Sequence, residues 1–320
     1  MSRYDNFRKF YDEQLKPDLE RMDRERRRVR RKVAAILLTT AVAVILELIL
    51  IPSGAEAPKI FIPMVTGMAG VIVAGVSSWS FRQEYKDKVI SRICGFTGED
   101  ISYSPGGFIP ETEFRNSRIF LVTPDSYKGE DYFSGRMGDT RIEFSEIEAK
   151  VRNTSGSGSD KRDEYTTIFR GILLIADFNK HFRTNTVVLP DTAERLFGKF
   201  GQTLQSVSPG RGTLIRLENP DFEKEFCVYG DDQVEARYIL TPALMERILA
   251  FRKKWKSRVS LSFTASRLYI AVNLNRNLFE APVFRPMADY EHTEDNLRFL
   301  TLLTGVVEDL NLNTRIWTKV

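Results

Sequence analysis

Two long apolar runs near the N-terminus constrain the fold of this 320-residue chain more than any other feature. Val33–Ile51 contains 19 residues with one charge, Glu47, and Ile60–Trp79 contains 20 residues with none. A helix of about 20 apolar residues can cross the hydrocarbon core of a bilayer. Buried core helices of a soluble protein explain two such runs poorly. The sequence therefore predicts a transmembrane hairpin over residues 33–81, with spans 33–51 and 60–79.

The first run must be distinguished from a cleavable signal peptide, because Ala55-Glu56-Ala57 has the small residues of a cleavage site. The apolar stretch of a signal peptide is usually about 7–15 residues long, which is shorter than this run. The preceding region contains acidic residues, and a second apolar run follows at once. We therefore interpret Val33–Ile51 as a retained anchor.

Positive charge is concentrated directly before the first run. Residues 1–32 contain 12 Lys and Arg and 7 Asp and Glu, a net charge of +5, whereas the whole chain carries +4. The segment Pro52–Lys59 offers only Lys59, and four basic residues follow the second run within residues 82–92. The positive-inside rule then predicts that both termini are cytoplasmic. This distribution favours membrane lipid, and not nucleic acid, as the partner of the basic segment.

Small and polar residues recur at helical spacing on both predicted spans, which favours close packing of the two helices. The recurring residues are Ala35, Thr39, Ala43 and Glu47 on the first span and Gly67, Gly70, Ala74 and Ser78 on the second. An antiparallel hairpin centred on Pro52–Lys59 places Glu47 near Thr66, whose hydroxyl can donate to the carboxylate. Glu47 is either a proton or ion site or a residue near the interface that reaches the outer headgroups. We favour the second interpretation.

Apolar stripes continue on both sides of the hairpin. Residues 1–32 are predicted to form an amphipathic, basic helix that is interrupted at Lys16-Pro17, and residues 82–97 a helical stalk. The hairpin register places Met22 beside Ile90 and Leu19 beside Ile93. We therefore expect the paired spans to extend as a two-helix stalk that fixes the following domain near the membrane.

Residues 98–320 are predicted to form a cytoplasmic α+β domain, with an antiparallel sheet and flanking helices, because several strand candidates are neighbours joined by turns. The strand candidates are Ile119–Val122, Thr140–Arg152, Thr166–Asp177, Thr186–Leu189, Thr213–Leu217, Phe226–Tyr229, Val259–Phe263 and Arg267–Asn273. The helix candidates are Asp191–Gln205, Pro242–Trp255 and Thr293–Leu310. Thr241 is the expected N-cap of the second helix, with Pro242 at its first position.

Residues for enzyme chemistry are scarce. The chain contains two His and two Cys, which excludes an HExxH site, a disulfide scaffold and a Cys-rich zinc module. It also lacks a P-loop, a GxGxxG turn after a strand and a GxSxG nucleophile elbow. We therefore expect no catalytic residues, no resident cofactor and no metal.

The densest polar stretch lies between a predicted strand and a predicted helix, where binding groups concentrate. The candidate binding loop consists of Asp231, Asp232, Gln233, Glu235 and Arg237. Its three carboxylates could hold Mg²⁺ or Ca²⁺. An Asp-rich turn with a Glu235–Arg237 pair explains the same residues, and we favour the turn. Arg170, inside an apolar strand, is a candidate cross-link to this loop.

Three motif groups lie in the predicted globular domain. They are Gly138-Asp139-Thr140 with Phe144-Ser145-Glu146, then Phe169-Arg170-Gly171 with Ala176–Lys180, and then Phe222-Glu223-Lys224, Phe226–Tyr229 and Asp232–Pro242 with Leu244-Met245. In these motifs the chain resembles the bacterial domain-of-unknown-function family 3137, over nearly its whole length. The resemblance implies a bacterial cytoplasmic (inner) membrane but supplies no activity and no catalytic residues. Genes of the family often lie near those of LemA-like membrane proteins, which implies, by association, a LemA-like candidate partner.

The leading prediction is a multi-pass, non-enzymatic module anchored in the membrane, whose cytoplasmic domain binds a partner protein or lipid. A homo-oligomer is compatible with it. The alternative is a membrane-tethered enzyme or divalent-metal module that uses the Asp231–Arg237 loop. A third possibility is ion passage around Glu47 in an oligomer of the hairpin.

Overall fold

The computed structural model of this chain describes residues 3–52, 56–98, 100–155, 162–178, 180–191, 211–282 and 284–313. The chain divides into two compact units, Met1–Phe96 with Phe279–Leu297, and Thr97–Leu278 with Arg298–Val320. The predicted α+β class is confirmed, because two long N-terminal helices precede an antiparallel sheet with flanking helices.

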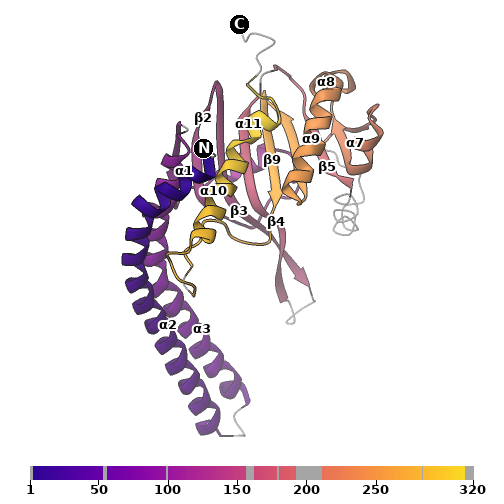
Figure 1. Cartoon of the computed structure of the whole chain (residues 1–320). Coiled ribbons are helices and arrows are strands. Elements are labelled where there is room, and N and C mark those ends of the chain that lie inside the picture. Colours follow the sequence, from indigo (N-terminus) through magenta and orange to yellow (C-terminus); the bar gives the residue numbers. More distant parts are fainter. Residues whose placement is uncertain are drawn as a thin grey trace. The chain divides into compact units, whose positions relative to one another are not determined.

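Two long helices run through the first unit, and each is assembled from segments joined by a π-helical turn (Figure 1). In chain order the segments are α1 (Arg3–Phe10), η1 (Tyr11–Leu15), α2 (Lys16–Leu50), α3 (Glu56–Tyr85), η2 (Lys86–Ile90) and α4 (Ser91–Phe96). The sequence predicted an interruption at Lys16-Pro17, and the structure places Pro17 in the first turn of α2, directly after η1. Proline has no N–H and crowds the preceding turn. The π-helical turn before Pro17 is wider than an α-helical turn and leaves room for the proline ring. The hydrogen-bond pattern therefore changes at this point, but the helix continues.

The apolar parts of α2 and α3 are long enough to cross a membrane and remain exposed in the isolated chain. The most apolar window is 0% buried in the first helix and 11% buried in the second. Leu50 and Ile60, near the turn between the helices, are 75% and 70% exposed. A soluble protein buries the apolar face of a core helix and rarely exposes apolar patches of this extent. Length, composition and exposure together indicate association with a membrane.

Beyond the apolar spans the helices continue side by side, as the stalk prediction required. Arg92 of α4 forms an ion pair with Asp18 of α2. The rings of Phe7 and Phe96 meet edge to face, with centroids 5.1 Å apart. The four residues that the predicted register brought together are each at most 2% exposed, namely Leu19, Met22, Ile90 and Ile93. The apolar stripes of the two helices therefore close within one chain.

Nine strands in the described part of the second unit form one antiparallel sheet, in the order β1-β2-β3-β4-β9-β8-β5-β7-β6. The strands are β1 (Asp100–Ser104), β2 (Ser126–Met137), β3 (Thr140–Ser155), β4 (Arg162–Asp177), β5 (Thr186–Pro190), β6 (Thr213–Ile215), β7 (Phe226–Gly230), β8 (Val259–Thr264) and β9 (Arg267–Asn273). Ala265 and Ser266 connect β8 to β9, and both have a positive φ, as a two-residue type I′ turn requires.

The centre of the sheet is buried on both faces. Leu173 and Ile175 of β4 pack in a hydrophobic cluster with Phe114 of α5 (Glu111–Asn116). Successive strand residues point to opposite faces of a sheet. Ile172 and Leu174 therefore face away from this cluster, yet each is only 1% exposed. Both faces of β4 are consequently covered, which explains its nearly continuous apolar sequence.

Helix α9 (Pro242–Trp255) has the predicted bounds, and the Leu244 N–H donates to Thr241 Oγ1 at its N-terminus. The predicted helix Thr293–Leu310 begins earlier and is divided at Gly305 into α10 (Tyr290–Thr304) and α11 (Val306–Asp309). The remaining short helices are α7 (Pro220–Glu225) and α8 (Gln233–Ile239). The predicted helix Asp191–Gln205 lies, after its first residue, outside the described residues.

The prediction of a strand at Ile119–Val122 is wrong. Ile119 and Phe120 are apolar because they pack into the hydrophobic cluster from a segment that pairs with no strand. Strands β1 and β2 are not predicted from the sequence. Their sequences contain Gly, Asp, Glu and Lys, which are depleted in strands. The pairing of β1 with β2 and of β2 with β3 compensates for this weak propensity.

Candidate functional site

Small and polar side chains form the interface between α2 and α3. Thr66 Oγ1 donates a hydrogen bond to Glu47 Oε1 at 2.8 Å, as the hairpin register predicted. Gly70 lies against the Thr40 side chain, and a Cβ atom at Gly70 would overlap with it. Ala74 and Ser78, on the following two turns of α3, are buried. The interface is therefore close-packed in the manner expected for membrane helices.

Other residues of the predicted packing set lie away from this interface. Ala43 is half-buried, but Ala35 and Thr39 are exposed, and Thr39 Oγ1 donates to the carbonyl of Ala35 in its own helix. A Cβ atom at Gly67 would meet nothing within 4 Å. Residues four apart drift by about 40° per step around a helix of 3.6 residues per turn. Thr39, two such steps from Glu47, therefore lies outside the face of α2 that contacts α3.

Glu47 points toward α3, so the favoured expectation that it reaches the outer headgroups is not met. Its Oε1 atom accepts from Thr66, and its Oε2 atom is buried without a hydrogen-bond partner among the described residues. A carboxyl group in the hydrocarbon region is costly unless its polar atoms are satisfied. The bond from Thr66 lowers this cost on one oxygen only.

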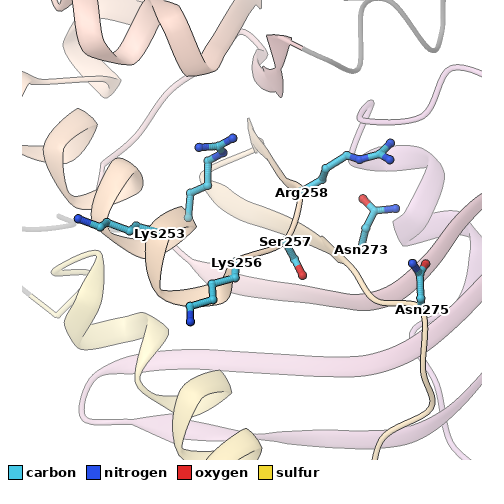
Figure 2. Close-up of a pocket in the computed structure, with 7 residues that line it drawn as sticks. Lys253, Lys256, Ser257, Arg258, Asn273 and Asn275 are labelled. Atoms are coloured by element: carbon cyan, nitrogen blue, oxygen red, sulfur yellow. The ribbon is translucent and has the colours of Figure 1, made fainter.

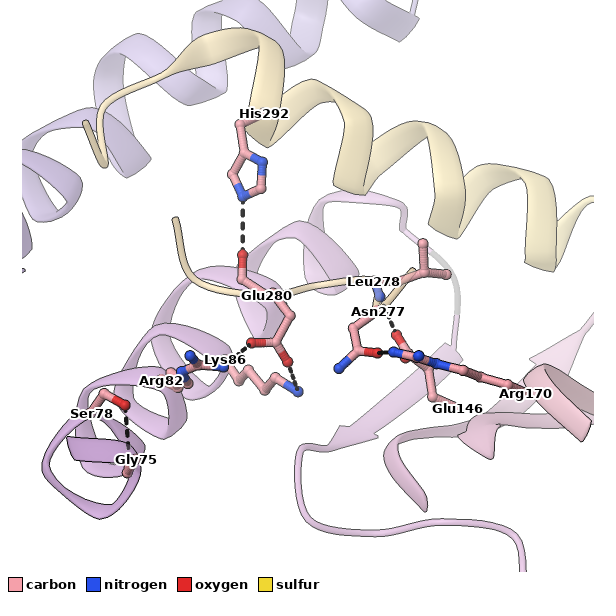
Figure 3. Close-up of polar contacts among 10 residues, drawn as sticks. All are labelled: Gly75, Ser78, Arg82, Lys86, Glu146, Arg170, Asn277, Leu278, Glu280 and His292. Carbon is pink, nitrogen blue, oxygen red and sulfur yellow. Dashed lines mark hydrogen bonds and ion pairs between the residues drawn. The ribbon is translucent and has the colours of Figure 1, made fainter. Parts of the chain in front are cut away.

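Residues Phe279–Leu297, here called the strap, belong to the same compact unit as the helices. Arg82 of α3 and Lys86 of η2 both reach the Glu280 carboxylate, at 3.1 and 3.4 Å (Figure 3). Lys86 is only 2% exposed, so its charge depends on this partner. His292 contacts the carbonyl of Glu280 through Nε2 at 3.1 Å. These contacts fix the start of the strap on the second helix.

The strap is also held by the first helix. The Met287 N–H donates to Asp23 Oδ1 at 3.1 Å, and Arg26 and Arg27 donate to the same carboxylate. Burial raises the pKa of Asp23, but the hydrogen bonds from Arg26, Met287 and Arg27 outweigh burial and lower the pKa below its ordinary value. Tyr290 packs edge to face on Tyr11, with ring centroids 5.2 Å apart. The strap therefore binds to both helices of the stalk.

The structure gives each carboxylate of the Asp231–Arg237 loop a local partner. Asp232 caps α8, because its Oδ1 atom accepts from the Val234 and Glu235 N–H groups at 2.7 and 3.2 Å. Asp231 Oδ2 accepts from Asn185 Nδ2 at 2.7 Å.

Glu235 accepts from the backbone N–H groups of Arg183 and Thr184 and from the Thr184 hydroxyl. Burial raises the pKa of Glu235, but these hydrogen bonds outweigh burial and lower it. Arg237 donates to the carbonyl of Arg216, so the suggested Glu235–Arg237 pair is not formed.

The outer surface of this loop and of α8 remains exposed. Asp231, Asp232, Gln233 and Arg237 are exposed, and the apolar side chain of Val234 is 76% exposed. Arg170 does not join this surface, because it donates to Asn277 Oδ1 at 2.7 Å (Figure 3). The predicted cross-link from Arg170 to the loop is therefore wrong.

A basic pocket, which the sequence analysis missed, lies between the end of α9 and the strands β8 and β9 (Figure 2). Its volume is about 560 Å³. Its lining residues are Arg252, Lys253, Lys256, Ser257, Arg258, Asn273 and Asn275. Ser257 lies between Lys256 and Arg258, and Asn273 and Asn275 lie on the side of Arg258 (Figure 2). The lining contains no carboxylate, which distinguishes it from the Asp231–Arg237 loop.

Groups for nucleophilic or metal chemistry are not gathered in the described residues. No group of three His, Cys, Asp or Glu side chains among them could hold a metal ion. Cys94 is buried in the stalk, and burial raises the pKa of its thiol to about 11. Cys227 lies in β7 with its Sγ atom 3.6 Å from Asp191 Oδ1. A protonated, buried thiol is a poor nucleophile.

The family described as "Protein of unknown function (DUF3137)" matches residues 167–312. The predicted resemblance is confirmed over these residues. The DUF3137 match contains the Asp231–Arg237 loop, α9 and the basic pocket. It does not reach the two long helices, so the DUF3137 resemblance of the hairpin remains a prediction.

The structure of a mycobacterial protein, the trehalose monomycolate transport factor A, TtfA, is similar with a TM-score of 0.33 and 10% sequence identity. The alignment covers 69% of this chain and 94% of that chain. A TM-score this low does not establish a shared fold. No curated protein matches the sequence.

Proposed function

We propose that this chain is a two-span protein of the bacterial cytoplasmic membrane whose cytoplasmic α+β unit docks a partner. The observation that carries the proposal is the exposure of the apolar windows of both long helices, 0% and 11% buried. Exposure of these apolar side chains to water is unfavourable, whereas their exposure to lipid tails is not. The concentration of Lys and Arg before the first span and after the second supports cytoplasmic termini.

The way the helices are held together supports docking rather than a loose tether. The spans pack through Gly70 and the Glu47–Thr66 hydrogen bond, and the stalk is closed by Arg92 and by the strap. A folded stalk restricts the motion of the chain that leaves the membrane, so this chain loses less conformational freedom when a partner binds. This supports an ordered anchor at the membrane.

We place partner binding on the exposed side of the Asp231–Arg237 loop and α8. Asp231 and Asp232 supply negative charge at the surface, and Val234 supplies an exposed apolar contact. A LemA-like membrane protein, which the family resemblance implies by association, is the candidate partner. The loop carboxylates already accept hydrogen bonds from this chain, which favours docking over a metal-binding or catalytic use of the loop.

The experiment is photo-crosslinking in intact cells from position 234, with position 121 as the control. Both native side chains, Val234 and Leu121, are exposed apolar residues. We expect one membrane protein to crosslink from position 234 and not from position 121, with identification by mass spectrometry. Its capture should weaken in the double variant Asp231→Asn, Asp232→Asn, because asparagine removes the charge and keeps the acceptor and the N-cap. Equal capture from both positions, or full capture by the double variant, would contradict the proposed surface.

Membrane anchoring is tested separately. The protein should stay in the membrane pellet after alkaline carbonate washing and enter solution only with detergent, because two spans bury their apolar side chains in the lipid. Release by carbonate would show a peripheral attachment and would overturn the anchor.

A further inference from the structure

The basic pocket gathers cations that the rest of the described chain does not neutralise. Among the described residues, Lys253, Lys256 and Arg258 take part in no ion pair, whereas Arg252 pairs with Glu225. No carboxylate lines the pocket. Like charges repel, and a depression lined by one sign of charge focuses the potential on whatever enters it. The pocket therefore attracts anions.

Helix stability explains only part of this cluster. Arg252 and Lys253 lie in the last turn of α9, where cations interact favourably with the carbonyl end of a helix. Lys256 follows the helix at a left-handed φ of 50°, a position that glycine or asparagine normally takes. Arg258 stands directly before β8 and caps no helix. Lys256 ends α9 through its backbone N–H, which donates to the Arg252 carbonyl, so its ammonium group is not needed for that role.

The donors around the pocket match phosphate oxygens. Guanidinium groups bind phosphate in a forked geometry, ammonium groups bind it as point charges, and hydroxyl and amide groups complete its hydrogen bonds. Arg258, Lys256, Ser257 and the amides of Asn273 and Asn275 offer this combination (Figure 2). The cavity, about 560 Å³, has the size of a small-molecule site. Several cations line it, so the oxygens of one phosphate group can contact more than one of them.

We propose that this pocket binds an anion that carries phosphate. This goes beyond the docking function, because it gives the α+β unit a ligand site of its own. The phosphate can belong to a free phosphorylated molecule or to the headgroup of an anionic phospholipid, and both present the same oxygens.

The first arm of the experiment measures binding of inorganic pyrophosphate to the full chain in phosphatidylcholine nanodiscs by titration calorimetry. The double variant Lys256→Asn, Arg258→Gln should bind at least about tenfold more weakly, because it loses two charge-assisted contacts. Asparagine tolerates the left-handed conformation of residue 256. The control variant Arg115→Gln, Lys128→Gln removes the same charge from two exposed residues outside the pocket and should bind as the unmodified chain does.

The second arm distinguishes the two sources of phosphate. Dihexanoyl phosphatidylglycerol, dissolved below its micelle concentration, should displace pyrophosphate if the pocket accepts a lipid headgroup, with dihexanoyl phosphatidylcholine as the neutral control. Pyrophosphate binding without such displacement assigns the pocket to a free phosphorylated molecule.

Thermal unfolding of each variant shows whether the globular unit is intact, and a folded pocket variant that binds like the control would overturn the proposal. Absence of binding of both pyrophosphate and phosphatidylglycerol to the unmodified chain would overturn it too. The nanodiscs contain no partner protein, so this experiment does not test docking. A failure to bind phosphate would therefore not contradict the proposed docking function.

Discussion

Gly70 on α3 has no room for a side chain, because a Cβ atom there would overlap with Thr40 on α2. Gly70→Ala should therefore push the spans apart and destabilise the hairpin by about 1–3 kcal/mol, the usual cost of overpacking. Gly75→Ala is the matched control, since a Cβ atom at Gly75 meets nothing within 4 Å. Unfolding in mixed detergent micelles measures both. Equal stabilities of the two variants would contradict the close contact at Gly70.

The Glu47–Thr66 hydrogen bond can be isolated with a double-mutant cycle. Thr66→Val should cost about 0.6–1.7 kcal/mol, as polar pairs in membrane helices do, and should cost nothing when Glu47 is already replaced by Leu. Glu47→Gln keeps an acceptor for Thr66 without the charge, so it should retain or increase the stability of the hairpin. A coupling energy of zero would show that the bond contributes nothing. A marked loss in Glu47→Gln would point to a role for the carboxyl group itself.

At the scale of the elements, the paired helices of the stalk predict an intramolecular crosslink. Met22 and Ile90 are both buried and lie on different helices of the hairpin. Cysteines at these two positions, in a Cys94→Ser, Cys227→Ser background, should form a disulfide within one chain. Non-reducing electrophoresis of the purified protein detects it. Crosslinking between chains, and not within them, would replace the stalk with an oligomeric bundle.

The strap should loosen in acid through Asp23. The pKa of Asp23 is lower in the folded chain than its ordinary value, so its ionisation stabilises the fold. This stabilisation is present above the unfolded pKa, about 3.9, and is lost as the pH falls through the lower folded pKa. At pH 7, Asp23→Asn should expose peptide 279–297 to faster hydrogen exchange. As the pH falls through the lowered pKa of Asp23, the protection of this peptide in the unmodified chain should approach that in the variant.

Exchange rates are corrected for intrinsic chemistry at each pH and followed by mass spectrometry. A peptide elsewhere in the chain, such as 242–255, serves as the internal control. Equal protection of peptide 279–297 in both proteins at pH 7 would show that the charge of Asp23 does not hold the strap.

The sequence predicted elements whose signals are local. The bounds of α9 follow from Thr241, Pro242 and an apolar period, and the Glu47–Thr66 contact follows from the length of the loop between two apolar runs. Partners from distant parts of the chain were not predictable. Glu280 meets Lys86 across nearly 200 residues, and Lys256 and Arg258 form a pocket with Asn273 only because β8 pairs with β9. In the sequence alone, these residues look like ordinary polar and charged surface residues.

At the scale of the whole molecule, the distribution of charge predicts the topology. Arg24–Lys32 contains seven basic residues and one acidic residue directly before the first span, whereas Pro52–Lys59 contains only Lys59 and Glu56. Lys and Arg residues in short loops and close to the ends of membrane spans stay on the cytoplasmic side. Tags at the N-terminus, the C-terminus and within Pro52–Lys59 should therefore be labelled by a membrane-impermeant reagent in intact cells only at the third position. Labelling of the C-terminal tag would overturn the prediction.

The distribution of charge also predicts how the orientation can be reversed. Replacing the basic residues of Arg24–Lys32 by Gln and adding three Lys within Pro52–Lys59 inverts the charge difference across the first span. At least part of the population should then expose the C-terminal tag, because both ends of the hairpin lie on one side and must exchange sides together. A control with three Ser residues added in place of the three Lys has the same loop length and leaves the charge of the loop unchanged. Its C-terminal tag should therefore stay protected from the reagent. If the Lys variant is also fully protected, features other than the basic segment set the orientation, and the positive-inside argument does not hold for this chain.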